Sequence, residues 1–547
     1  MIDKHYKSSW TNKERLAKSD WQLPGVPGDP PIGTLGEVVM MEGDDDGFTS
    51  RHLAAEINIH YPSAGITANW LIWVWPNVPG IRTQLSFEVL EDHEPAGLGF
   101  PANSRTETLP FTVGSAQRRF IGWRGTNALT YEPTDGCLVE KTDKDQLKAP
   151  QSMRWPVAVA LEDRKHGLAL VREGPGDFAR NRHLPMHFQL DPLLGIAGTG
   201  VFAGEFSVDN PMIAPAYWTI CYPNTAGGRE WAFKSLERAR FPRSFGSPPI
   251  ALLELSKLEK RPIYRQLAHC RFKLAQIASD DLVIARICRE VEEAETSMEF
   301  QPDSMTAVLG HELRAAREAG LDGGIMLPGE LMAYNGEWAI HSHHVKNLVQ
   351  ILRLKSIGVT GITNLRDDEH ILLNRRWRVG LTSQSSLTSH IATEGFHHIG
   401  PWDMRDGGMK WTFSPHQARD LRYCYCPLTV MRFLWDIAPY IALQGLVVPV
   451  ADPVSVAGAE SENARYSLTA AIASAFFSVP CLLGGELELP PKVLGVIKKV
   501  MTAREKAQTQ LKRCLISRLG HAPDHRHWSG LVAYDAHGRK GYIVAIR

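Results

Sequence analysis

Residues 305–327, MTAVLGHELRAAREAGLDGGIML, hold the pattern that decides the fold of this chain. The stretch predicts a helix over Met305–Ala319 and then an apolar strand over Gly323–Leu327. A second unit of the same kind follows, with a helix over His344–Ile357 and a strand over Val359–Asn364. Helices of this length alternating with strands are typical of βα units around a parallel sheet.

The alternation continues on both sides of this stretch. It predicts strands over Ile250–Leu255 and Leu446–Ala451, and helical sequence over Tyr264–Ile277, Leu282–Glu295, Leu428–Ile441 and Tyr466–Ser478. Over roughly 250 residues, a (β/α)8-type barrel is the natural closed form, and we leave open whether it is complete. The apolar stretch Leu468–Leu483 is shorter than the ~20 residues of a bilayer span, so we expect a buried helix there.

The N-terminal half has a different pattern, of short β-type runs separated by turn signals such as YPSAG and NVPG. The runs are LAAEINIHY, NWLIWVW, RTQLSFEVL, PVAVALE, GLALVRE and AYWTICY. Many strands without a long helical period predict a large antiparallel β-sandwich. A helix over Gly228–Ala239 closes this part.

We therefore expect α and β structure in several parts. They are an extended lead-in (1–45), a β-sandwich (46–245), the barrel (246–515) and a short C-terminal β segment (516–547). In the last part, LVAYDAHGRKGYIVAIR predicts a hairpin.

Composition excludes several classes of function. Lys+Arg and Asp+Glu are 60 each, so no net charge attracts nucleic acid or an anionic membrane. The GxGxxG and GxxxxGK[ST] signatures are absent, so we expect no nucleotide cofactor, and no other cofactor is indicated. The N-terminus has no apolar signal segment, and the eight cysteines show no disulfide spacing. These features favour free thiols and a cytoplasmic location.

Several segments, in the right order over about 450 residues, resemble one known family. They are PGIRTQ (79–84), Glu173-Gly174, the block Trp218–Pro242 ending in ARFP, Gly336-Glu337-Trp338, YCYCPLTVMRFLWDIAPY (423–440), ASAFFSVPCLLGGELEL (473–489) and Gly520–Ile546. Together they are similar to a bacterial branch of glycoside hydrolase family 36, the α-galactosidase-like proteins. The resemblance places Gly336-Glu337-Trp338 after the second barrel strand, the seventh βα unit at 423–440 and the eighth helix at 473–489.

The resemblance implies glycoside hydrolysis by two carboxylates across the sugar. In the family the nucleophile sits in a Lys-x-Asp at the end of barrel strand four, and the acid/base is an Asp two strands later, in a segment ending Thr-Glu. After residue 300 this chain has no Lys-x-Asp, and the sequence between Asn364 and Gly395 is short for the usual strands. Two registers remain for the acid/base: Thr393-Glu394 matches the Thr-Glu, or Asp403 follows Trp402 as the Trp-Asp of that strand. Both Asp403 and Glu394 are therefore catalytic candidates.

Other residues near predicted strand ends are candidates for holding the sugar. Trp338 and Trp402 offer aromatic faces to a sugar ring, and Glu330 replaces an acidic pair after a strand. The remaining candidates are Asp367, Asp368 and His398. The two histidine groups, at 341–344 and 397–398, lack a metal-ligand spacing, so we expect no metal.

Two functions fit these observations. The first, which we favour, is a glycoside hydrolase acting on α-galactoside-type or related sugars, and the second is a non-catalytic carbohydrate-binding or scaffold protein. In both the expected partner is a carbohydrate, with neither nucleic acid nor membrane involved. A homo-oligomer is left open.

Overall fold

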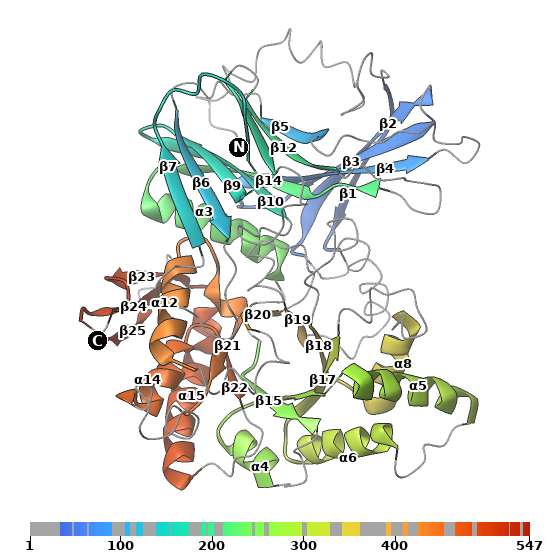
Figure 1. Ribbon diagram of the computed structural model, residues 1–547, viewed down its shortest axis with the longest axis vertical. Helices are drawn as coiled ribbons and strands as arrows, with labels where there is room; N and C mark the ends of the chain where they lie inside the picture. Colours follow the sequence, from blue (N-terminus) through green and yellow to red (C-terminus); the bar gives the residue numbers. More distant parts are fainter. Residues whose placement is uncertain are drawn as a thin grey trace.

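The structure is a computed structural model of the chain. It describes residues 33–45, 49–62, 65–89, 104–109, 116–123, 138–153, 155–173, 187–192, 195–201, 212–242, 245, 247–255, 262–279, 281–297, 304–328, 342–360, 390–394, 409–413, 425–452, 465–483, 490–524, 526–535 and 540–547. A sandwich of two sheets lies above a barrel, and a small C-terminal sheet lies beside the barrel (Figure 1). In these ranges no helix has the length and apolar character that crossing a bilayer requires.

The sandwich is built on a ten-stranded antiparallel sheet. Its order is β1-β2-β3-β4-β14-β10-β9-β6-β7, with β13 paired to β4. The bounds are β1 (Thr34–Gly43), β2 (His52–Tyr61), β3 (Ile66–Val74), β4 (Gly80–Val89), β6 (Gln117–Trp123), β7 (Leu138–Asp143), β9 (Pro156–Glu162), β10 (His166–Glu173), β13 (Met212–Ile213) and β14 (Ala216–Pro223). The six predicted runs are β2, β3, β4, β9, β10 and β14. The predicted lead-in differs, because its residues Thr34–Gly43 form the edge strand β1.

The second sheet covers one face of this large sheet. It has the order β5-β12-β11-β8, with β5 (Ser104–Leu109), β8 (Gln151–Met153), β11 (Phe188–Asp191) and β12 (Gly195–Val201). Between the sheets lies a core that includes Val159, Leu170, Phe188 and Tyr217. Strands β9 and β10 are buried on both faces, which is why their sequences are continuous apolar runs.

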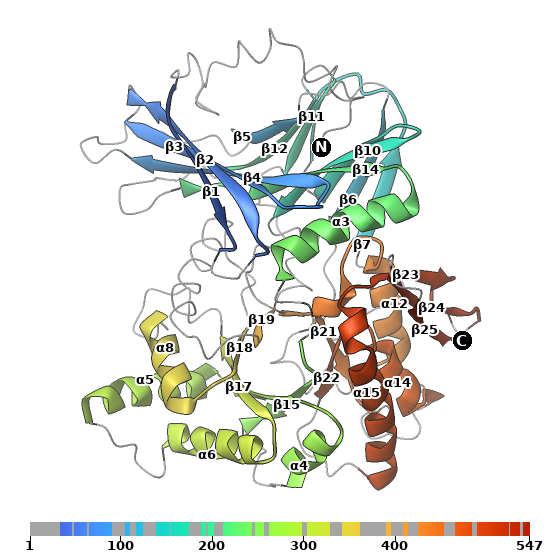
Figure 2. The same cartoon turned by 180° about the vertical axis from the view of Figure 1, so that it is seen from behind.

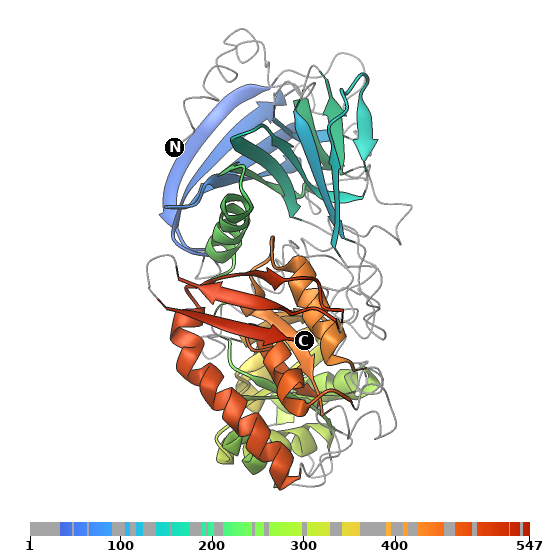
Figure 3. The same ribbon diagram turned by 90° about the vertical axis from the view of Figure 1, so that its left-hand side faces the viewer.

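Helix α3 (Ala226–Arg240) packs on the other face of the large sheet and separates it from the barrel (Figures 2 and 3). Thr225 caps the helix by accepting a hydrogen bond from the amide of Gly228 (3.0 Å). The buried Phe233 contacts Tyr222 of the sheet (6.2 Å between ring centroids) and Tyr440 of the barrel (5.3 Å). The predicted closing helix is therefore confirmed, and it bridges the two parts.

Eight parallel strands close the barrel, in chain order. They are β15 (Ile250–Glu254), β16 (Leu274–Ala278), β17 (Asp322–Pro328), β18 (Ser356–Thr360), β19 (His390–Glu394), β20 (Met409–Trp411), β21 (Leu446–Val450) and β22 (Val479–Leu483). Following registered neighbours from Ile250 once around the barrel returns to position 242, an offset of eight residues. That offset is the shear of a (β/α)8 barrel, so the predicted barrel is confirmed and closed.

The described helices follow the strands as the alternation predicts. They are α4 (Pro262–His269) after β15, α5 (Asp281–Ser297) and α6 (Met305–Glu318) after β16, α8 (Ser342–Leu352) after β17, α12 (Pro427–Ile437) after β20, α14 (Leu468–Ser474) after β21 and α15 (Pro491–Leu511) after β22. A 3-10 turn, η5 (Leu443–Gly445), precedes β21. The segments 361–389 and 395–408, which join β18 to β19 and β19 to β20, lie outside the described residues.

Two predicted helices are too long, and both errors have the same cause. The predicted helix Tyr264–Ile277 is α4 followed by strand β16, and the predicted helix His344–Ile357 is α8 running into β18. Arg271 (φ 69°) and Arg353 (φ 51°) have left-handed backbone conformations that end these helices. The amide one residue later donates to a carbonyl five residues back in each, as in a Schellman motif. Glycine normally marks this stop, and here arginine replaces it.

The segment Leu468–Leu483 was expected to be one buried helix, and this was wrong. It forms the short helix α14, a turn, and the fully buried strand β22. The C-terminal hairpin is confirmed as β24 (Ser529–Tyr534) and β25 (Gly541–Ile546), but a third strand, β23 (Leu515–Gly520), pairs with β24. β23 directly follows α15.

Candidate functional site

The carboxyl ends of the barrel strands are where a site is expected, because the loops that shape such sites begin there. Two described strands end in a carboxylate residue, Glu254 on β15 and Glu394 on β19. Asp452 follows β21 by two residues. Glu394 was predicted from the sequence, whereas Glu254 and Asp452 were missed. An acidic residue ending the apolar run IALLE was the available signal for Glu254.

The strand order corrects the count on which the resemblance was carried over. Because β16 was hidden in a predicted helix, Gly323–Leu327 belongs to the third strand and Val359 to the fourth. The family's nucleophile position therefore follows β18, where the sequence continues Gly-Ile-Thr-Asn after Thr360. No carboxylate occurs in those four residues.

The acid/base position is displaced in the same way. Two strands after β18 comes β20, which is followed by Thr412 and Phe413, both fully buried. The Thr412 hydroxyl donates to the carbonyl oxygen of Val447 (2.8 Å). Glu394 ends the fifth strand, in register with Trp411 of the sixth. At the described residues, therefore, neither of the two strand ends that match the family's catalytic carboxylates has a carboxylate residue in this chain.

The other predicted residues lie outside the described part of the chain. They are Asp403, Glu330, Trp338, Trp402, Asp367, Asp368 and His398. Of the predicted set, the structure places only Glu394, as the last residue of β19.

One layer of the barrel interior contains a buried polar side chain, Gln276. A Cβ on Gly323 would meet Leu313 of α6, whereas one on the next residue, Gly324, would meet the side chain of Gln276, so Gly324 and Gln276 face inward. The strand register then places Gln276, Gly358, Trp411 and Cys481 on alternate strands at one height, as layers in such barrels are built. A Cβ on Gly358 would lie 3.3 Å from Gln276 Nε2, which agrees with this placement.

Two polar atoms of this layer have unmet hydrogen-bonding capacity. The Gln276 amide donates to the Ile325 carbonyl, but its Oε1 and the indole Nε1 of Trp411 have no partner among the described residues. Both side chains are completely buried. A buried donor and a buried acceptor left unpaired cost free energy unless water or a ligand satisfies them. Burial also raises the pKa of the Cys481 thiol well above its usual value, so the thiol is unreactive.

Buried carboxylates elsewhere in the described residues have structural partners. Glu162, at the end of β9, accepts hydrogen bonds from Arg119 (2.9 Å), Arg229 (3.1 Å) and Tyr222 (3.0 Å). Burial would raise the pKa of Glu162, but the two guanidinium groups and the tyrosine outweigh it and hold the pKa below its usual range. An acceptor so fully engaged is unsuited to moving a proton.

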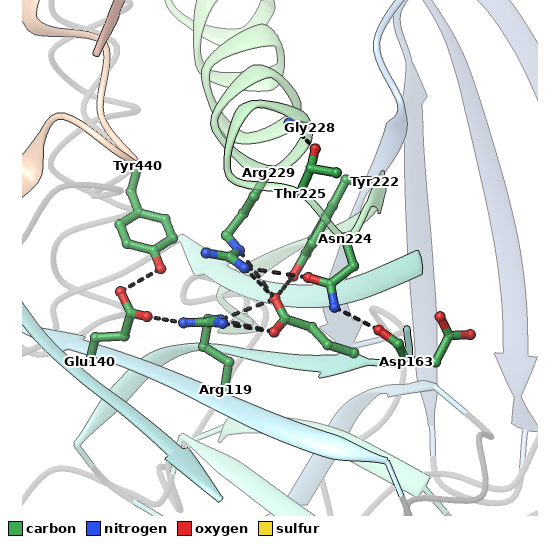
Figure 4. Close-up of polar contacts among 10 residues, drawn as sticks. Arg119, Glu140, Asp163, Tyr222, Asn224, Thr225, Gly228, Arg229 and Tyr440 are labelled. Carbon is green, nitrogen blue, oxygen red and sulfur yellow. Dashed lines mark hydrogen bonds and ion pairs between the residues drawn. The ribbon is translucent and has the colours of Figure 1, made fainter. Parts of the chain in front are cut away.

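This cluster also joins the sandwich to the barrel. Tyr440, just after α12, donates its hydroxyl to Glu140 of β7 (2.7 Å), and Glu140 also pairs with Arg119 (Figure 4). Glu173 forms a second buried group, with Arg82 (2.9 Å) and Arg240 (3.4 Å). These ion pairs join helix α3 to the large sheet. We assign them no catalytic role.

No family model and no curated protein matches this sequence, whereas several solved structures are similar to this chain. A solved structure of a variant of the family 36 α-galactosidase AgaA from Geobacillus stearothermophilus, in complex with 1-deoxygalactonojirimycin, is similar with a TM-score of 0.61 at 10% identity, over 94% of this chain and 79% of that one. The α-galactosidase AgaB from the same organism (TM-score 0.57, 11% identity) is similar over 94% of this chain and 81% of its own.

A third solved structure agrees. The α-galactosidase from Lactobacillus brevis has a TM-score of 0.56 at 11% identity, over 94% of this chain and 76% of that one. Identity this low shows the fold and leaves the activity open. The chain thus has a divergent glycoside hydrolase family 36-like fold, as the ordered segments of its sequence predicted.

Proposed function

We propose that this chain is a glycoside hydrolase that acts on α-galactoside-type sugars at the carboxyl end of its barrel. The observation that carries the proposal is the pair of glutamates that end opposite barrel strands, Glu254 on the first and Glu394 on the fifth. Hydrolysis of a glycoside needs one carboxyl group to protonate the leaving oxygen and a second to attack or to activate water.

In this proposal Glu394 carries the proton and Glu254 is the second carboxylate. Asp403 stays the alternative proton carrier. Trp338 and Trp402 provide the sugar platform, and the remaining predicted residues, Glu330, Asp367, Asp368 and His398, contact sugar hydroxyls. The choice of sugar is supported by the similar solved α-galactosidases, two of which are variants in complex with raffinose and stachyose.

A non-catalytic sugar-binding protein is the second candidate. A specific observation favours it, because neither the fourth strand, β18, nor the sixth, β20, ends in a carboxylate residue. The two residues after the sixth strand, Thr412 and Phe413, are buried and carry no carboxylate either. Under either function, Gln276 Oε1 and Trp411 Nε1, which have no hydrogen-bond partner among the described residues, could bind a polar group of a ligand.

The test combines turnover with binding. Wild type, Glu394→Gln, Glu254→Gln and Asp403→Asn are assayed on aryl α- and β-glycosides and on raffinose, and sugar binding is followed by calorimetry. We expect turnover of α-galactosides, lowered about 10²–10⁴-fold in Glu394→Gln and Glu254→Gln with binding retained. Glu505→Gln, a half-exposed carboxylate on α15, is the matched control and should leave turnover unchanged.

The other outcomes separate the candidates. Binding without turnover in wild type makes the chain a sugar-binding protein. A loss of turnover confined to Asp403→Asn would assign the role of proton carrier to Asp403. Neither binding nor turnover on any sugar would reject both functions.

A further inference from the structure

The C-terminal sheet of β23, β24 and β25 has one face on the neighbouring helices and one face outward. Its inner face packs on α3, α12 and α14, where Ile516, Leu531 and Ala533 are buried. The other face points away from the barrel (Figure 3). Trp528, which directly precedes β24, is 61% exposed. A single exposed apolar side chain is ordinary, so what Trp528 binds has to be argued from the groups around it.

The turn that carries Trp528 has a fixed backbone. Gly520, the last residue of β23, has a left-handed φ of 71°, and a Cβ on it would lie 2.3 Å from the carbonyl oxygen of Trp528. Only glycine fits this approach, and the amide of His521 donates to the same carbonyl (3.2 Å). Beneath the turn, Arg518 donates to two carbonyl oxygens at the end of α12 (2.7 and 2.6 Å). The indole is therefore held on a rigid support, which lowers the entropy cost of binding a ligand.

Polar side chains of fixed orientation lie in the same turn. One carboxylate oxygen of Asp524 accepts hydrogen bonds from the amides of Arg526 and His527 (both 2.9 Å), and the other accepts from His527 Nδ1 (2.7 Å). These donors, the amide of His527 above all, hold the pKa of Asp524 well below its usual range, so the carboxylate stays charged and the imidazole stays oriented. The ring of His521 lies beside that of His527, with 4.8 Å between the centroids. Both Asp524 and His527 remain accessible to solvent.

The chemistry of this turn fits a sugar ring better than other ligands. A pyranose has an apolar face of C–H groups, which suits an exposed indole, and hydroxyls at its rim, which both donate and accept hydrogen bonds. The two imidazoles and the Asp524 carboxylate supply donors and acceptors in the same turn as the indole. A metal ion is disfavoured, because the described residues contain no group of three or more His, Cys, Asp or Glu side chains arranged to hold one. An anionic ligand would meet the charged carboxylate of Asp524.

We propose that Trp528, His521 and the Asp524–His527 pair form an accessory site, outside the barrel, for a pyranose ring of a galactose-containing polysaccharide. The indole stacks on the ring, and the two imidazoles and the carboxylate bind its hydroxyls. The choice of ligand class rests on the proposed function, which takes the partner of the chain to be a carbohydrate. Because both sites belong to one chain, a polymer bound at Trp528 is presented to the barrel at a raised effective concentration.

Affinity electrophoresis of the full chain, in gels that contain galactomannan (a polysaccharide with α-galactosyl branches), measures the binding. Trp528→Ala should raise the dissociation constant at least ~10-fold, as expected for the loss of an aromatic anchor, and His527→Ala about fivefold for a lost hydrogen bond. Trp528→Tyr keeps a flat aromatic ring and should stay within about threefold of wild type. Trp231→Ala, at another exposed tryptophan (41%, on α3), is the matched control and should leave binding unchanged.

A second measurement locates the bound sugar. Galactomannan should slow the oxidation of Trp528 by N-bromosuccinimide, followed by peptide mass spectrometry, and should leave the oxidation of Trp231 unchanged. Equal retardation of wild type and Trp528→Ala, or equal oxidation of Trp528 with and without galactomannan, would overturn the proposal.

Turnover of aryl α-galactosides by wild type tests the barrel separately. Turnover without retardation that depends on Trp528 rejects only the accessory site. Retardation that depends on Trp528 without any turnover supports the accessory site and rejects only the hydrolase.

Discussion

Gly358 lies in the middle layer of the barrel, at a point where the neighbouring side chains leave no room for a methyl group. A Cβ there would lie 2.2 Å from the Met326 sulfur and 3.3 Å from Gln276 Nε2. Packing against the end of the Met326 side chain, rather than backbone conformation, thus favours glycine here. The same layer holds the large Trp411, so small and large side chains fill the interior together, as close packing demands.

This packing predicts the effect of a single methyl group. Gly358→Ala should lower the free energy of unfolding by about 1–3 kcal/mol, because the Met326 side chain must move in a filled interior. Gly495→Ala is the matched control. Gly495 lies in α15 with no atom within 4 Å of its added Cβ, so the change should stabilise by about 0.5–1 kcal/mol. Urea unfolding measures both, and equal effects of the two substitutions would contradict the assigned layer.

At the scale of elements, helix α3 shows how burial changes the chemistry of one side chain. Its Lys234 is buried, donates to the carbonyl oxygen of Ile516 in β23 (2.5 Å), and lies 3.4 Å from Glu230. Burial lowers the pKa of Lys234 to about 8, even though Glu230 acts to raise it. The helix thus carries an amine that loses its proton well below the usual pH.

Linkage gives the sign of the resulting pH dependence. The unfolded chain keeps the Lys234 proton up to about pH 10.5, while the folded chain releases it near pH 8. Between these values the unfolded state binds more protons, so the contribution of Lys234 to stability rises with pH. We expect wild type to gain stability over Lys234→Met from about pH 8 to pH 10, by at most on the order of 3 kcal/mol.

Urea titrations at several pH values measure this difference. The exposed Lys499 on α15 provides the control, since Lys499→Met should leave the pH dependence of wild type unchanged. If instead the stability of wild type relative to Lys234→Met falls as pH rises, the pKa of Lys234 is not lowered by burial.

At the scale of the whole molecule, α3 and the C-terminal sheet connect the sandwich to the barrel. Glu237 of α3 accepts from the amide of Ala442 (2.7 Å), and Arg238 donates to the carbonyl of Arg513 (3.1 Å). Tyr440 reaches further, to Glu140 at the edge of the sheet. The barrel and the sandwich therefore share polar contacts, of which the one between Glu237 and Ala442 is buried, as well as the apolar contact between Phe233 and Tyr440.

Loss of the hydrogen bond between Tyr440 and Glu140 should lower the stability of the whole chain. Tyr440→Phe leaves the Glu140 carboxylate without its 2.7 Å donor and should cost about 1.5–3 kcal/mol, the range for a hydrogen bond to a charged group. Tyr425→Phe, which removes a 3.4 Å bond to a neutral carbonyl within the barrel, should cost less. Denaturant unfolding measures both, and an equal or smaller loss in Tyr440→Phe would contradict the role of this contact.

Much of the fold could be predicted because the pattern is local. The six sandwich runs, helix α3 and strands β15, β17 and β21 follow from apolar periodicity and turn residues within each segment. The errors came where a local signal was missing. Because arginine replaces glycine at Arg271 and Arg353, the ends of two helices were missed. Missing the first of these ends also hid strand β16, so the strands were counted wrongly.

The site depends on tertiary structure. The sequence alone determined a sandwich and a (β/α)8-type barrel, since side-chain period and composition are properties of neighbouring residues. Glu394 became a candidate through the resemblance of Thr393-Glu394 to the Thr-Glu of the family. Only the closed barrel decided that Glu254 and Glu394 end opposite strands and that Gln276, Gly358 and Trp411 share a layer. Strand register and shear are set by pairing between separate segments of the chain, up to the closure of β15 on β22 that pairs Ile250 with Cys481, and no local pattern encodes them.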